Sequence, residues 1–161
     1  MNKKVEDILN RQVEREAYSS SLYLAMASWA EVSGLPGVAR WLYAQSDEER
    51  MHMLKFVKFI NERGGQALVP ALKKPEKEYK SVKLLFQDVL KHEQFITASI
   101  NEIVELCIRE KDYTVNNWVQ WFVEEQIEEE ANVREIIDKL TLAKENLYII
   151  DRDIMMLREK D

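Results

Sequence analysis

The segment at residues 46–56, SDEERMHMLKF, places a carboxylate and an imidazole where a helix is expected to place core side chains. Apolar residues flank the segment at alternating spacings of four and three, which bring side chains onto one face of a helix. Glu49 and His52 lie on that face, one turn apart, where both could bind one metal ion. The full stripe reads Val38, Leu42, Gln45, Glu49, His52, Phe56 and Phe59.

Three further stripes with the same spacing are mainly apolar, and each carries one carboxylate near its middle, namely Glu16, Glu93 or Glu129. A single such residue is more often one that reaches the surface. Four at matching depth would be hard to bury, because removing a carboxylate from water costs several kcal/mol unless it is compensated. No Lys or Arg occupies the central part of any stripe. Protonation or bound cations remain, and His52 favours cations.

The types of ligand indicate which cation would bind. Four carboxylates, one imidazole and one amide oxygen, that of Gln126, form a hard to borderline set without a thiolate. Such a set suits iron or manganese and also admits zinc, but it is not typical of structural zinc sites. Four carboxylates balance the charge of two divalent ions, and the second oxygen of Glu49 could bridge them. The sequence therefore predicts a pair of ions about 3.5–4 Å apart.

Five helices are expected to position these residues, because helical periodicity runs through almost the whole chain. A long connection without periodicity, residues 66–80, contains Pro70 and Pro75. The pattern predicts one all-α domain over residues 1–161, a four-helix bundle with one long crossover and a short fifth helix. A coiled-coil rod is disfavoured by the Gly and Pro breaks. The expected helices cover residues 5–33, 38–63, 81–109, 113–142 and 145–157.

The expected fifth helix has an apolar face of its own, made of Leu147, Ile150, Ile154 and Leu157. A helix this short is marginal alone and must bury such a face. Because four stripes already close the bundle core, we expect this face to contact other copies of the chain. The alternative is a helix folded back on its own subunit.

Composition narrows the function classes. The 161 residues carry a formal net charge of −6, which argues against a nucleic-acid partner or an anionic membrane surface. There is one cysteine, Cys107, which ends an apolar stripe and is expected to pack. No apolar run approaches the roughly 20 residues of a membrane span, and no signal-peptide pattern is present. A cytoplasmic location is expected.

Four motifs stand out, namely EREAYSSSLYL (14–24), EERMH (48–52), KHEQF around Glu93 and WFVEEQIEEE (121–130). Together they resemble the ferritin family, specifically a prokaryotic non-haem ferritin. The resemblance extends from Val5 to Leu157 and includes the helix order, the crossover and the fifth helix. It implies iron storage, with Fe(II) oxidised by O2 or H2O2 at a di-iron ferroxidase centre and kept as a ferric mineral. It also implies a homo-oligomeric shell of twenty-four subunits.

The resemblance also implies ligand sets, residue by residue. Glu16, Glu49 and His52 would hold one iron. Glu49 would bridge to a second iron, held by Glu93 and Glu129, with Gln126 beside it. A third, transient site would use Glu48, Glu125, Glu128 and Glu129.

Aromatic side chains near the expected iron pair could also take part in the chemistry. Tyr23, two turns after Glu16, would assist electron supply or organise the site, although a core tyrosine is an equal alternative. Trp121 could play a similar part. His92 lies beside its stripe and is expected to be a surface histidine.

Departures from related families refine these expectations. Bacterioferritins repeat ExxH on the fourth helix, where this chain has Gln126 and Glu129, and Arg50 replaces their haem methionine, so no haem is expected. Asn116 and Val119 stand where animal heavy chains have acidic pore residues, which leaves the iron entry route open. Two alternatives are a DNA-protecting mini-ferritin, disfavoured by the acidic charge and the fifth helix, and a non-enzymatic helical scaffold.

Overall fold

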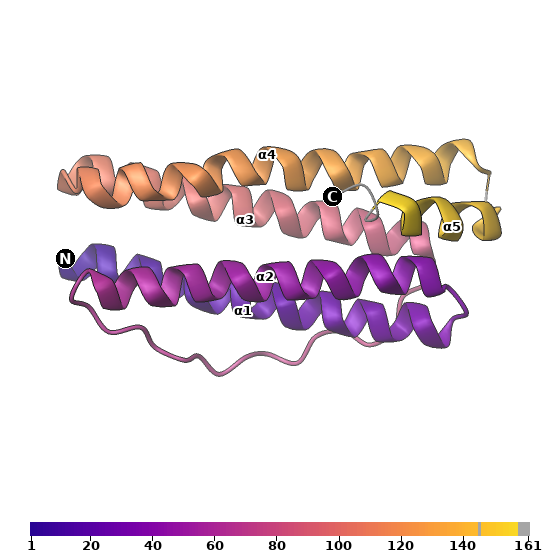
Figure 1. Cartoon of the computed structure of the whole chain (residues 1–161), viewed down its shortest axis with the longest axis horizontal. Coiled ribbons are helices and arrows are strands. Elements are labelled where there is room, and N and C mark those ends of the chain that lie inside the picture. The colour runs from indigo at the N-terminus through magenta and orange to yellow at the C-terminus, as the bar shows by residue number, and fades with distance from the viewer. Residues whose placement is uncertain (145, 158–161) are drawn as a thin grey trace.

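The computed structural model describes residues 1–144 and 146–157, and its regular secondary structure is helical. Four long helices run side by side and a short fifth helix lies at one end of the bundle (Figure 1). The predicted fold class is therefore confirmed. The predicted start of the fifth helix at residue 145 lies outside the described residues, as do residues 158–161. The helices are α1 (Lys3–Val32), α2 (Pro36–Glu62), α3 (Val82–Glu110), α4 (Tyr113–Leu142) and α5 (Leu147–Leu157).

Local signals in the sequence account for the helix ends. The Ser81 hydroxyl accepts a hydrogen bond from the backbone N–H of Leu84, and the Asp112 carboxylate accepts one from Val115, so both residues cap helix N-termini. Gly34 follows the end of α1 with a φ of 75°, a left-handed conformation that favours glycine. Among the described residues, no helix combines the length and the apolar character needed to cross a membrane.

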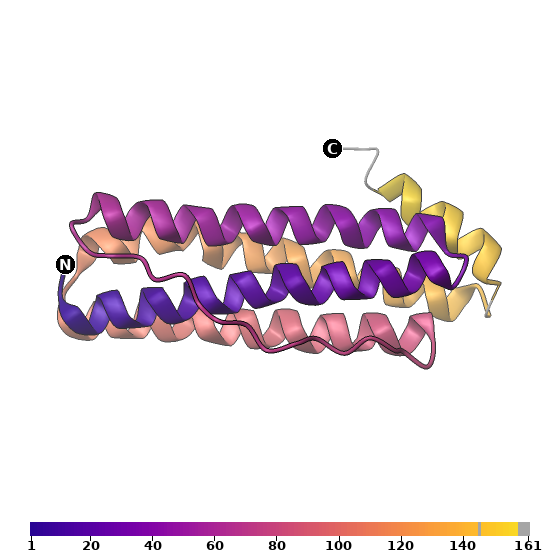
Figure 2. The same cartoon turned by 90° about the horizontal axis from the view of Figure 1, so that it is seen from below.

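The long crossover joins α2 to α3 and runs along the outside of α1 and α3 (Figure 2). Its first residues are fastened to α1 through Asn10. The side-chain amide of Asn10 donates to the Gln66 carbonyl at 3.1 Å, and its Oδ1 accepts from the Leu68 N–H at 2.8 Å. Because the crossover spans the bundle lengthwise, α3 begins at the opposite end from where α2 stops.

Two apolar clusters fill the two ends of the bundle interior. One contains residues such as Leu42 and Phe86, and the other contains residues such as Leu9 and Phe56. Between the clusters the four long helices contribute buried polar side chains, which we call the polar layer. Its members are Gln12, Glu16, Ser19, Gln45, Ser46, Glu49, His52, Glu93, Ser99, Gln126 and Glu129.

α5 packs on its own chain, against α2 and the end of α4. Ile150 and Ile154 are 2% and 0% exposed and belong to the apolar cluster around Leu42. The expectation that these two residues contact other copies is therefore wrong. α5 thus extends the apolar cluster at the end of the bundle where α2 begins.

A close approach between α5 and the start of α2 makes Gly37 intolerant of a side chain. The Asp151 carboxylate accepts hydrogen bonds from the backbone N–H groups of Gly37 (3.0 Å) and Val38 (2.8 Å), in place of a side-chain cap from Leu35. A Cβ on Gly37 would lie 1.9 Å from the Asp151 carbonyl oxygen, so one backbone would have to move.

Gly37→Ala is thus expected to displace α5 and to cost about 1–3 kcal/mol of stability. Hydrogen exchange should show lost protection in α5 with α1 unchanged. Asp151→Asn should act in the same direction more weakly, by about 0.5–2 kcal/mol, because a helix cap is weakened. Asp153→Asn is the matched control. Full protection of α5 in the Gly37→Ala variant would contradict this account of the contact.

Candidate metal centre

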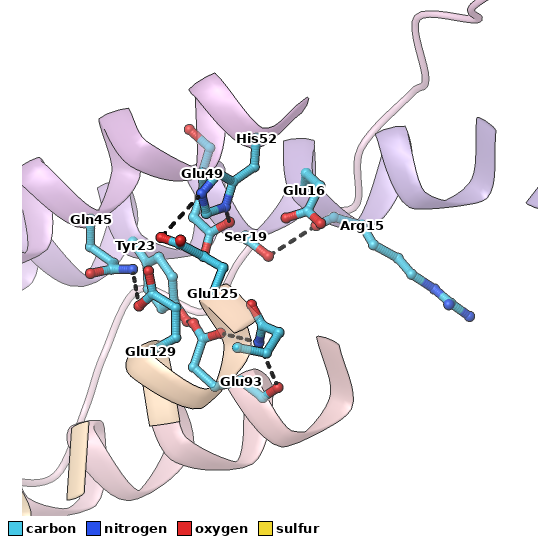
Figure 3. Close-up of polar contacts among 12 residues, drawn as sticks. Arg15, Glu16, Ser19, Tyr23, Gln45, Glu49, His52, Glu93, Glu125 and Glu129 are labelled. Atoms are coloured by element: carbon cyan, nitrogen blue, oxygen red, sulfur yellow. Dashed lines mark hydrogen bonds and ion pairs between the residues drawn. The ribbon is translucent and has the colours of Figure 1, made fainter. Parts of the chain in front are cut away.

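The polar layer brings together side chains from all four long helices. Glu16 comes from α1, Glu49 and His52 from α2, Glu93 from α3, and Glu129 from α4, and these side chains converge in the bundle interior (Figure 3). Each is at most 4% exposed. The helical period had placed these residues on core faces, and the structure buries all of them.

One compact group in this layer consists of Glu16, Glu49 and His52. Each offers one potential ligand atom, and these atoms all lie within 4.8 Å of one another. His52 Nδ1 is 3.2 Å from Glu49 Oε2. Glu16 Oε2 is buried and has no hydrogen-bond partner within the described part of the chain. An unpaired buried acceptor costs about 1–3 kcal/mol, and a cation bound by this group would remove that cost. The residues present therefore fit a metal ion.

Glu93 is held by two hydrogen-bond donors. The Tyr23 hydroxyl donates to Glu93 Oε1, and Gln126 Nε2 donates to Glu93 Oε2 at 3.1 Å and to the Glu93 carbonyl at 3.2 Å. Tyr23 is fully buried. Gln126 thus lies beside Glu93 as a hydrogen-bonding group.

Glu129 faces the same interior, and its Oε2 accepts a hydrogen bond from Gln45 Nε2 at 2.7 Å. Neither Glu93 nor Glu129 belongs to the compact group of Glu16, Glu49 and His52. Both nevertheless lie close enough to Glu49 for their charges to raise its pKa. Glu49 therefore interacts electrostatically with a carboxylate on α3 and with one on α4.

A second compact group lies on the other side of His52. Ligand atoms of Glu48, His52 and Glu125 all lie within 4.8 Å of one another, and His52 Nε2 is 3.9 Å from Glu125 Oε1. Two members of the predicted third site, Glu48 and Glu125, are thus brought together. The other two predicted members, Glu128 and Glu129, do not belong to this group, and Glu128 is exposed.

Burial changes the proton affinity of the inner carboxylates. Removal from water is the largest cause that raises the pKa of Glu16 and of Glu49 well above the ordinary value, and repulsion by neighbouring carboxylates raises both further. The pKa of Glu93 is also raised by burial, against the lowering effect of its hydrogen bonds from Tyr23 and Gln126. A cation entering this site would therefore displace protons.

Sequence reasoning missed the amide groups that orient two of the carboxylates. Gln12 Nε2 donates to Glu16 Oε1 at 2.6 Å, and Gln12 Oε1 lies 2.8 Å from the Ser99 hydroxyl. This contact holds one oxygen of Glu16 and leaves the other free for a cation. Gln12 and Gln45 lie on the apolar stripes one turn before Glu16 and Glu49. A polar residue on an otherwise apolar face was the sequence signal that could have identified both glutamines.

His92 is half-buried, not a surface residue as expected. Its Nε2 lies 2.7 Å from the Ser19 hydroxyl, and its ring packs edge-on against Tyr23 with centroids 5.9 Å apart. Burial lowers the pKa of His92 to about 4. The expectation failed because α1 covers the flank of α3 on which His92 lies.

The metal-free protein is expected to lose stability as the pH rises above 4.5, the ordinary carboxyl pKa. The folded-state pKa values of Glu16 and Glu49 lie above that value, so the folded protein holds protons that the unfolded chain has released. The contribution of Glu16 and Glu49 to stability is present below the ordinary carboxyl pKa. It is lost as the pH rises through their raised folded-state pKa values.

Thermal unfolding of the chelator-treated protein between about pH 5 and 8 measures this loss. Glu49→Gln should flatten the dependence and gain about 1–4 kcal/mol at the upper end, whereas Glu62→Gln, an exposed control, should not. An unchanged pH dependence in Glu49→Gln would contradict the assignment of the loss to the polar layer.

The comparisons with known proteins agree with this fold. Residues 6–143 match the family model of the ferritin-like domain, and the chain belongs to the ferritin family. The resemblance inferred from the motifs is thus confirmed. The chain is 39% identical over 166 residues to a bacterial non-heme ferritin of Campylobacter jejuni, covering 99% of both chains. It is 40% identical over 163 residues to a probable bacterial non-heme ferritin-like protein of Haemophilus influenzae, again over 99% of both.

Solved structures with a similar fold are also ferritins. An open pore ferritin from the hyperthermophilic archaeon Archaeoglobus fulgidus superposes with a TM-score of 0.94 at 39% identity, covering 96% of each chain. An engineered closed form of that ferritin superposes equally well, with the same TM-score of 0.94.

Proposed function

We propose that this protein stores iron and oxidises Fe(II) to Fe(III) at a di-iron ferroxidase centre in the polar layer. One observation carries the proposal. The buried, unpaired oxygen of Glu16 lies in a group with Glu49 and His52 whose ligand atoms are all within 4.8 Å of one another. A buried acceptor of this kind fits a cation, and the family to which the chain belongs makes iron the cation of choice.

The family resemblance and the burial of these carboxylates together support one assignment of ligands to the two irons. Glu16, Glu49 and His52 would hold the first ion. Glu49 would bridge to the second, held by Glu93 and Glu129. Each Fe(II) binds as a substrate, displaces protons from carboxylates of raised pKa, gives one electron to O2 or H2O2, and leaves as Fe(III). All of these ligands come from one chain, which supports a ferritin over a mini-ferritin whose site spans two subunits.

Tyr23 is the second proposed catalytic residue. Its hydroxyl donates to Glu93, and both burial and nearby carboxylates raise the pKa of Tyr23 well above the ordinary value, so the phenol stays protonated. If Tyr23 gives an electron to the oxidant, its proton can pass to Glu93 along this hydrogen bond. Tyr23→Phe should then retain iron binding and slow oxidation.

Storage requires a container, and we propose the twenty-four-subunit shell of the family with a ferric mineral inside. A similar archaeal protein is described as an open pore ferritin, so pores of different size are compatible with this subunit fold. Iron taken up as Fe(II) fits the cytoplasmic location expected from the sequence.

An anaerobic Fe(II) titration followed by addition of oxygen tests the proposal. We expect saturable binding of about two Fe(II) per subunit, a weaker third ion, and rapid oxidation when oxygen is admitted. Glu16→Gln should weaken the first ion, whereas Glu14→Gln, an exposed neighbour, should not. A protein without saturable Fe(II) binding would instead be a helical scaffold.

A further inference from the structure

A lysine lies one turn beyond the second compact acidic group. Glu48, His52 and Lys55 follow one another along one face of α2 at spacings of four and three residues. Trp121 and Glu125 are four residues apart on α4, which faces them. On both helices the acidic side chain lies toward the bundle centre. One turn farther out, α2 carries the cation Lys55 and α4 carries the aromatic ring of Trp121.

The Lys55 ammonium is held in place by Trp121. Its Nζ lies 2.9 Å from the centroid of the Trp121 ring and 5.9 Å from that of Phe122, a cation–π arrangement. The Trp121 ring packs edge-on against His52, with centroids 5.5 Å apart. His52 in turn faces Glu125. The positive charge therefore has a defined position next to the group of Glu48, His52 and Glu125.

The charges are within electrostatic reach of one another. Burial lowers the pKa of Lys55, and the carboxylates of Glu125 and Glu48 act against that lowering. A cation bound between Glu48 and Glu125 would accordingly be repelled by Lys55. Coulomb repulsion grows in proportion to the charge of the bound ion, so a trivalent ion is repelled one and a half times as strongly as a divalent ion in the same place.

We propose that Lys55 limits the affinity of the cation site formed by Glu48, His52 and Glu125 and discriminates against the trivalent state. This inference rests on the proposed function, because Glu48 and Glu125 are two of the four members predicted for the third iron site. Fe(II) can bind there, and after oxidation the Fe(III) product is released more readily toward the mineral. Lys55 is a specificity-determining residue that need not touch the ion.

Terbium and zinc serve as trivalent and divalent probes. Tb3+ luminescence sensitised by Trp121 reports binding at this site, and the part of the signal lost in Trp121→Phe defines it. Competition by Zn2+ against that signal gives the divalent affinity. At low ionic strength, Lys55→Gln should tighten Tb3+ binding about tenfold and Zn2+ binding about fivefold, and added salt should shrink both gains.

Three variants separate charge from shape. Lys55→Arg keeps the charge and should behave as the wild type, Lys55→Met should behave as Lys55→Gln, and Lys58→Gln removes an exposed charge on the same helix as a control. Unchanged affinities in Lys55→Gln, or equal gains for both ions, would overturn the inference. If the wild type gave no Trp121-sensitised signal, or Glu125→Gln left it intact, the third site itself would be refuted, while the Fe(II) titration would still test the inner pair.

Discussion

Glu49→Ala is expected to abolish rapid oxidation of Fe(II), lowering its initial rate by roughly 100-fold or more. Loss of groups that merely support metal ligands costs 10–100-fold in affinity or activity, and Glu49 is placed as a ligand. It is grouped with Glu16 and His52 on one side and is repelled by Glu93 and Glu129 on the other.

Oxygen consumption after mixing with two Fe(II) per subunit measures the effect, and Asp47→Ala, an exposed position on the same helix, is the control. The Glu49→Ala variant should keep its helix content and its assembly state, since only one side chain of the polar layer is lost. Rapid, stoichiometric oxidation by this variant would remove the basis for the di-iron assignment.

The helical period alone could place the acidic residues of the candidate site. A period of 3.6 residues assigns each residue to a face, so Glu16, Glu49, Glu93 and Glu129 stood out against apolar neighbours before any contact was known. The long crossover was equally accessible, because Pro70 and Pro75 interrupt the period. These features depend on one helix or one segment at a time.

Contacts between helices could not be placed in the same way. The pairs Gln12–Ser99 and Gln45–Glu129 depend on how each helix is rotated and how far it is shifted along the bundle, and a stripe of apolar residues defines neither to within one side chain. The position of Lys55 on Trp121 depends on the same variables. Such contacts join residues on different helices, and they complete the site.

For α5, the sequence predicted that a face is buried but could not predict which surface covers it. An amphipathic pattern indicates that a face is covered but does not say by what. Ile150 and Ile154 are covered by the same chain, whereas Ile149 and Met156 remain 42% and 51% exposed. The latter two are seven residues apart and share one face of the helix. If the proposed shell forms, this exposed face is where α5 would meet its copies.

The double variant Ile149→Glu, Met156→Glu is therefore expected to prevent the shell from closing, so that sedimentation shows small oligomers and stored iron is lost to a chelator. Helix content and α5 docking should persist, because the Ile150 side of α5 is untouched. Ile154→Glu should act differently: it buries a charge within the subunit, costs several kcal/mol, and exposes α5 to exchange. Thr141→Glu, an exposed position near the end of α4, is the charge control. A double variant that sediments and retains iron like the wild type would show that the exposed face of α5 does not join subunits.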